Sequence, residues 1–93
     1  MRSAQRKWGK EMAEESFACE VLEVGTQADS GKIAIKLLEV GGRGGWKEWC
    51  YAADSMRREI LATGLTALSI RARVAVFMNM DDKVIKRINV LRP

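Results

Sequence analysis

Apolar and polar residues alternate with a period of two along several stretches of the chain, the pattern typical of half-buried β-strands. Turn-forming residues such as glycine, asparagine and aspartate separate these stretches. The pattern predicts five strands, at residues 17–24, 32–40, 46–52, 68–78 and 84–91.

Two of the predicted strands have an irregular pattern. In the first, the apolar positions change phase after Val21, which indicates a β-bulge or a strand that serves two sides of a barrel. The last strand can place either Ile85 or Ile88 with its apolar face, so its register stays open. The fourth strand alternates without interruption, and its inward residues are expected to be Leu68, Ile70, Ala72, Val74, Val76 and Met78.

Two helices are expected besides the strands. Residues 54–63 read as a short helix, with Asp54 as its N-cap and Gly64 as its C-terminal stop. Residues 3–15 carry apolar residues at intervals of four and read as a helix or an arm. We therefore divide the chain into an N-terminal helix or arm, residues 1–16, and a barrel domain, residues 17–93.

A glycine-rich segment, residues 41–45, lies between the second and third predicted strands. It contains four glycines around Arg43 and predicts a mobile hairpin tip. No Lys-Ser or Lys-Thr pair follows it, so it is not a phosphate-binding loop of the Walker type.

The order helix–β–β–β–α–β–β resembles that of the OB-fold, a five-stranded Greek-key barrel. The resemblance spans residues 17–92, and it is closest to small single-strand-binding and replication-type OB proteins. It implies a mainly β protein whose second and third strands contact an oligonucleotide. An SH3-like or Sm-like barrel is the alternative, but the helix at 54–63 has no place in that layout.

Composition narrows the function further. The chain has 93 residues with no histidine and two cysteines, so the commonest general base is missing and no zinc site can form within one chain. Cys19 and Cys50 are expected to be buried free thiols. We expect no enzymatic activity, no metal and no cofactor. The net charge of +4 is concentrated in residues 68–93, where six basic residues meet two acidic ones.

Aromatic residues interleaved with basic ones are the one positive functional signal. Trp46 and Trp49 point to opposite faces of the third strand, and the sequence leaves open which of them faces the core. If Trp49 is exposed, bases can stack on it while lysines follow the phosphates. The candidate binding residues are Lys32, Lys36, Arg43, Lys47, Trp49 and Tyr51, extended by Arg71, Arg73 and Phe77.

The sequence thus predicts a non-enzymatic protein that binds single-stranded DNA or RNA. The alternative is a protein-interaction or assembly module on the same barrel, such as an adaptor, a homo-oligomer, or an accessory protein of a phage or plasmid. No apolar run reaches the roughly 18 residues of a membrane span and no signal peptide is evident, so a cytoplasmic protein without membrane contact is expected.

Overall fold

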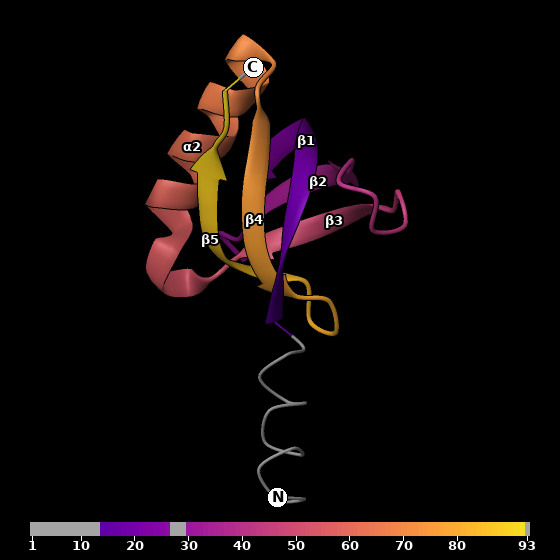
Figure 1. Ribbon diagram of the computed structural model, residues 1–93. Coiled ribbons are helices and arrows are strands. Elements are labelled where there is room, and N and C mark those ends of the chain that lie inside the picture. Colours follow the sequence, from indigo (N-terminus) through magenta and orange to yellow (C-terminus); the bar gives the residue numbers. More distant parts are fainter. Residues whose placement is uncertain (1–13, 27–29, 93) are drawn as a thin grey trace, which may run out of the picture.

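The computed structural model describes residues 14–26 and 30–92, which form a closed five-stranded barrel with one α-helix packed against it (Figure 1). The strands follow one another around the barrel in the order β1-β2-β3-β5-β4, and β4 closes on β1. All neighbouring strands are antiparallel except β3 and β5. The elements are β1 (Glu14–Thr26), β2 (Ile33–Glu39), β3 (Lys47–Ala52), the 3-10 helix η1 (Asp54–Met56), α2 (Arg57–Ile70), β4 (Arg73–Asn79) and β5 (Val84–Val90).

The long first strand holds the barrel together because it pairs on both of its edges. Its first half pairs with β4 and its second half with β2. The register with β2 shifts between Val21 and Glu23, so Leu22 has no opposite partner. This bulge accounts for the change of phase in the sequence, as predicted. The strand begins at Glu14, so residues 14–16 belong to the barrel rather than to the N-terminal arm, and residues 1–13 lie outside the described part.

The core fills the barrel with the apolar faces that the alternation predicts. Ile35 and Leu37 of β2, with Val74, Val76 and Met78 of β4, are fully buried. Cys19 and Cys50 are buried free thiols, as expected. In β5, Ile85 and Ile88 are both buried because Lys86 is bulged out of the register with β4. The ambiguous pattern of that strand therefore had a structural cause.

The helical segment begins at residue 54, as predicted, but it continues to Ile70 and is longer than expected. No side chain caps the N-terminus of η1 or α2, so Asp54 is not an N-cap. Gly64 does not stop the helix: it is buried within it, where a Cβ would lie 2.9 Å from the Cδ1 atom of Ile35. The glycine thus serves close packing against the barrel. The helix ends instead at Arg71, whose φ of 56° is left-handed.

The longer helix also corrects the fourth strand, which begins at Arg73 rather than Leu68. Leu68 and Ile70 were expected to point inward but are 38% and 49% exposed on the helix. Residues 68–70, Leu-Ser-Ile, alternate between apolar and polar as a strand does. Three residues are too few to distinguish the period of a strand from that of a helix.

Candidate nucleic-acid interface

The outer face of β2 and β3 carries two aromatic side chains in neighbouring rows. Lys36 pairs with Trp49, and Ala34 pairs with Tyr51. Trp49 is 40% exposed and Tyr51 is partly exposed, whereas Cys50 between them is buried in the core. The alternation of β3 therefore turns Trp49 and Tyr51 outward.

The other tryptophan of this segment, Trp46, lies on the opposite face. Its ring meets that of Phe17 edge to face, with 5.3 Å between the centroids, and it packs against the core. The question that the sequence left open is thus answered: Trp46 is structural and Trp49 is accessible.

Each outward aromatic ring has a lysine beside it. The Nζ atom of Lys36 lies 5.8 Å from the ring centroid of Trp49. The Nζ atom of Lys32 lies at the same distance, 5.8 Å, from the ring centroid of Tyr51. Cation–π attraction of about 0.5–1 kcal/mol at exposed sites is consistent with these positions. We call Lys32, Lys36, Trp49 and Tyr51 the outer aromatic face.

A hollow of about 260 Å³ lies against this face, lined by Gly25, Thr26, Ala34, Trp49 and Tyr51. It is smaller than the pockets of roughly 300–1,000 Å³ that enclose drug-sized ligands, so it suits one ring system.

The charges around the outer aromatic face are mixed. Lys47 is exposed on the same strand and lies opposite Leu38, next to the row of Lys36 and Trp49. A carboxylate oxygen of Glu23 lies 3.9 Å from the Nζ atom of Lys36. The exposed fraction of the Glu23 side chain is 61%, so water screens this pair and Lys36 is held only weakly.

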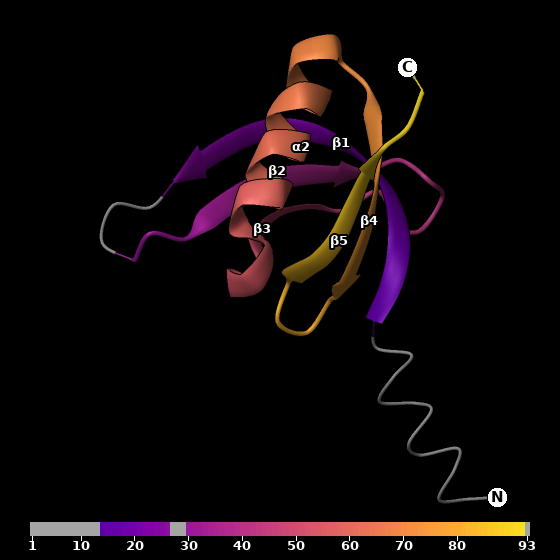
Figure 2. The ribbon, with the colours of Figure 1, turned by 90° about the vertical axis from the view of Figure 1, so that its left-hand side faces the viewer.

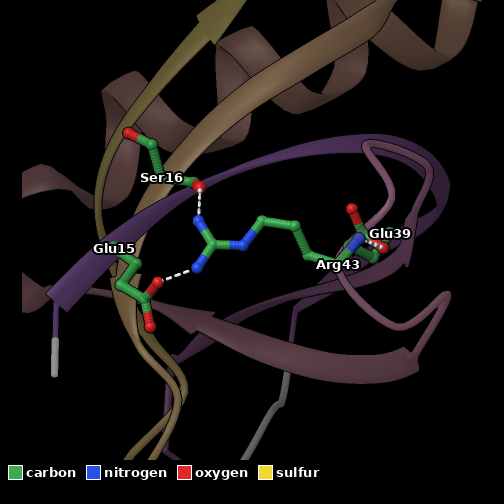
Figure 3. A network of polar contacts seen from close by, with 4 residues as sticks. All are labelled: Glu15, Ser16, Glu39 and Arg43. Carbon is green, nitrogen blue, oxygen red and sulfur yellow. Dashed lines mark hydrogen bonds and ion pairs between the residues drawn. The ribbon is translucent and has the colours of Figure 1, made fainter.

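Arg43 does not join the lysines of this face. The loop that carries it bends toward the start of β1, where its guanidinium contacts the Glu15 carboxylate and donates to the carbonyl of Ser16 (Figure 3). The guanidinium carbon also lies 5.1 Å from the ring centroid of Phe17. The sequence placed Arg43 near Lys32 and Lys36. The loop of Arg43 follows the C-terminal end of β2, whereas Lys32 precedes the start of that strand, and Figure 2 shows these two ends of β2 on opposite sides of the barrel.

The glycine-rich loop is tied down rather than free, contrary to the mobile tip that we expected. The Glu39 side chain is 2% exposed and accepts hydrogen bonds from the backbone N–H groups of Gly41, Arg43 and Gly45, at 2.6, 2.9 and 2.8 Å. Burial by itself would raise the pKa of Glu39, but these three bonds and the Arg43 charge outweigh it and lower the pKa. We call Glu15, Phe17, Glu39, Arg43 and Trp46 the loop cluster.

Arg73 and Phe77 lie in a third place, on the outer face of β4. Phe77 pairs with Ser16 near the start of β1, whereas Lys36 pairs with Glu23, seven residues further along that strand. At about 3.3 Å per residue, this puts Phe77 roughly 20 Å from Lys36 along β1. Arg73 pairs with Glu20, so it lies closer, roughly 10 Å from Lys36 along the same strand. Arg87 lies 5.7 Å from the Phe77 centroid. Arg71, at the end of α2, lines a second hollow with Glu20, Val21, Leu68 and Ala72.

The thiols offer no reactive group. Burial raises the pKa of Cys19 and of Cys50 to about 12, so both remain protonated near neutral pH. Within residues 14–26 and 30–92, no three His, Cys, Asp or Glu side chains come together in a group that could hold a metal ion. Nor does this part of the chain contain a helix of the length and hydrophobicity needed to cross a bilayer.

Sequence reasoning missed two residues of this region. Gly25 lines the hollow, but it directly follows the predicted strand at residues 17–24, where a glycine indicates a turn, so the sequence carried no signal for this role. Glu39 holds the loop, and its position two residues before the glycine-rich segment 41–45 was the available clue.

Comparisons of the chain with protein-family models, with curated proteins and with solved structures find no significant match.

Proposed function

We propose that this protein binds single-stranded nucleic acid, DNA or RNA, on its outer aromatic face, without catalysing a reaction. The observation that carries the proposal is the repetition of one arrangement in two adjacent places, an outward aromatic ring with a lysine ammonium beside it. An aromatic ring offers a stacking surface to a base, and a lysine offers a charge to the phosphate next to it.

The spacing of the two rings supports the proposal. Trp49 and Tyr51 are two residues apart on one strand, which separates them by about 6.6 Å. Bases stacked within one strand are about 3.4 Å apart, so two consecutive bases can reach the two rings only when they are unstacked. Single strands allow this readily, whereas duplexes do not.

The strand order gives support by analogy. A closed barrel in the order β1-β2-β3-β5-β4 with a helix between β3 and β4 is compatible with an OB-like fold, whose second and third strands bind oligonucleotides. Fold analogy alone is a weak basis for function, so the proposal rests on the side chains. Binding of intracellular nucleic acid would accord with the cytoplasmic location that the sequence predicts.

The test is binding of a fluorescently labelled oligothymidylate, measured by anisotropy. We expect binding that weakens steeply between about 50 and 200 mM salt, because phosphate contacts release counterions. Trp49→Ala should weaken binding about 5- to 150-fold, the equivalent of losing ~1–3 kcal/mol of stacking. Trp49→Phe, which keeps a ring, is the matched control and should retain most of the affinity. Absence of binding by the unaltered protein at low salt would refute the proposal.

A second candidate function, a protein-interaction module, is favoured by a separate observation. Several large apolar side chains are exposed near the C-terminal end of α2 and the end of β5, which lie close together in both ribbon views (Figures 1 and 2). They are Leu65, Leu68, Ile70, Val90 and Leu91. Exposed apolar surface of this kind suits a protein interface. Failure of the oligonucleotide to bind at low salt would favour this candidate.

A further inference from the structure

Gly25 is a glycine that the fold itself does not require. It lies within β1, and it is not among the glycines with positive φ, so its backbone suits any residue. Among the residues that the structure describes, none has an atom within 4 Å of a Cβ built at this position. A glycine inside a strand lowers stability relative to a residue with a side chain. The reason for it has to be sought outside folding.

The surroundings of Gly25 indicate what that reason is. Gly25 pairs with Ala34, which in turn pairs with Tyr51. One row across three strands therefore consists of two small residues followed by an aromatic one. The neighbouring row, formed by Glu23, Lys36 and Trp49, carries large side chains throughout. The two small residues, Gly25 and Ala34, lie beside this row of larger side chains and form the floor of the hollow.

The direction of a side chain at position 25 follows from the strand. Val24 packs against the core, so the next residue points outward because side chains alternate along a strand. A side chain at Gly25 would therefore project over the outer face and into the hollow that Gly25, Ala34 and the two aromatic residues line.

We propose that Gly25 and Ala34 form the floor of a seat for a single unpaired nucleobase, with Trp49 and Tyr51 as its walls, and that Gly25 is the residue that keeps this seat open. The inference rests on the proposed function and makes it specific. A planar base can lie against a floor without side chains, and Lys32 and Lys36, beside the two rings, are placed to take the adjoining phosphates. Gly25 is a residue that sets which groups fit, not one that supplies charge.

The test compares Gly25→Val with the unaltered protein, using labelled oligothymidylate and an abasic strand of the same length. We expect Gly25→Val to weaken oligothymidylate binding at least tenfold while the thermal midpoint stays the same or rises, since valine favours strands. The two proteins should bind the abasic strand alike, because it has phosphates but no base. Ala75→Val, on the outer face of β4, is the matched control and should leave both affinities unchanged.

The outcomes separate this inference from the proposed function. If the unaltered protein binds neither strand at low salt, the proposed function fails and the seat with it. If it binds oligothymidylate and Gly25→Val binds equally well, the seat alone is refuted. A clear fall in the thermal midpoint of both Gly25→Val and Gly25→Ala would also refute it, because folding would then require the glycine.

Discussion

The outer aromatic face and the loop cluster contain the same kinds of residue and are built in opposite ways. In both, a cationic side chain lies near an aromatic ring, at 5.8 Å for Lys36 and Trp49 and 5.1 Å for Arg43 and Phe17. Arg43 is also bound by a carboxylate and a carbonyl, and its loop is anchored on a buried glutamate. Lys36 has one weakly held carboxylate neighbour.

The difference shows that a cation beside an aromatic ring does not by itself indicate a binding site. The other partners of the cation must also be considered, because they decide whether its charge is available to a ligand. Arg43 would have to give up its protein contacts before it could meet a phosphate. Lys32 would have to give up its place beside the partly exposed Tyr51 ring. Lys36 would have to give up its place beside the Trp49 ring and its water-screened ion pair with Glu23. This difference is the reason why we propose the outer aromatic face, and not the loop cluster, as the binding surface.

The largest expected effect separates the two tryptophans. Trp46→Ala should lower the free energy of unfolding by about 2–3 kcal/mol, since it removes a half-buried ring and its edge-to-face contact with Phe17. Trp49→Ala should change it by no more than about 0.5 kcal/mol, as for most surface positions. Urea denaturation monitored by circular dichroism measures the unfolding free energies of both variants. Equal losses would mean that Trp49 is a structural residue and would remove the contrast between the regions.

The next effect concerns the pH dependence of the loop cluster. Glu39→Gln should destabilise the protein at neutral pH, because an amide keeps one acceptor oxygen and presents N–H donors in place of the other. At least one of the three backbone N–H groups that the carboxylate binds would then face a donor. The lowered pKa of Glu39 means that its ionised form is favoured in the folded protein. Its stabilising effect is therefore complete above the ordinary glutamate pKa of 4.5 and is lost as the pH falls through the lower value in the folded state.

Thermal unfolding of both proteins between pH 3 and 7 provides the measurement. The gap between unaltered protein and Glu39→Gln should be constant above about pH 4.5 and close below it. Glu48→Gln is the matched control, since Glu48 is half exposed and lies 3.9 Å from Lys83, and it should show a much smaller gap. A gap for Glu39→Gln that does not narrow in acid would show that the carboxylate charge is not what holds the loop.

The sequence predicted the five strands well, apart from the start of the fourth, because alternation over six or more residues leaves little choice of face. It predicted the burial of Cys19 and Val74 for the same reason. The sequence failed to predict where the helix ends. Gly64 was expected to end it, but this glycine lies within the helix and allows close packing against Ile35. That contact lies between residues far apart in the chain, and no local pattern reveals it.

The candidate site was predictable only in part. Alternation showed that Trp46 and Trp49 face opposite ways, but choosing between them needs the partner of each, and Phe17 lies on another strand. Arg43 was expected near Lys36 because the second and third strands were expected to form a hairpin with Arg43 at its tip. Its actual place depends on Glu39 and Glu15, whose contacts turn the loop toward β1. Side chains on a loop follow such contacts rather than any period of the sequence.

The smallest expected effect applies the comparison to Lys36 and Arg43 directly. For single strands, the slope of log K against log salt is about −0.7 for each phosphate contact. Lys36→Ala should therefore make the slope shallower by about 0.7, whereas Arg43→Ala should leave it unchanged, because its charge is already held by Glu15 and Ser16. Both variants remove one positive charge, so a difference between them reflects position rather than net charge. Equal changes in slope would show that Arg43 leaves its cluster to meet the ligand, and the loop would then belong to the binding surface after all.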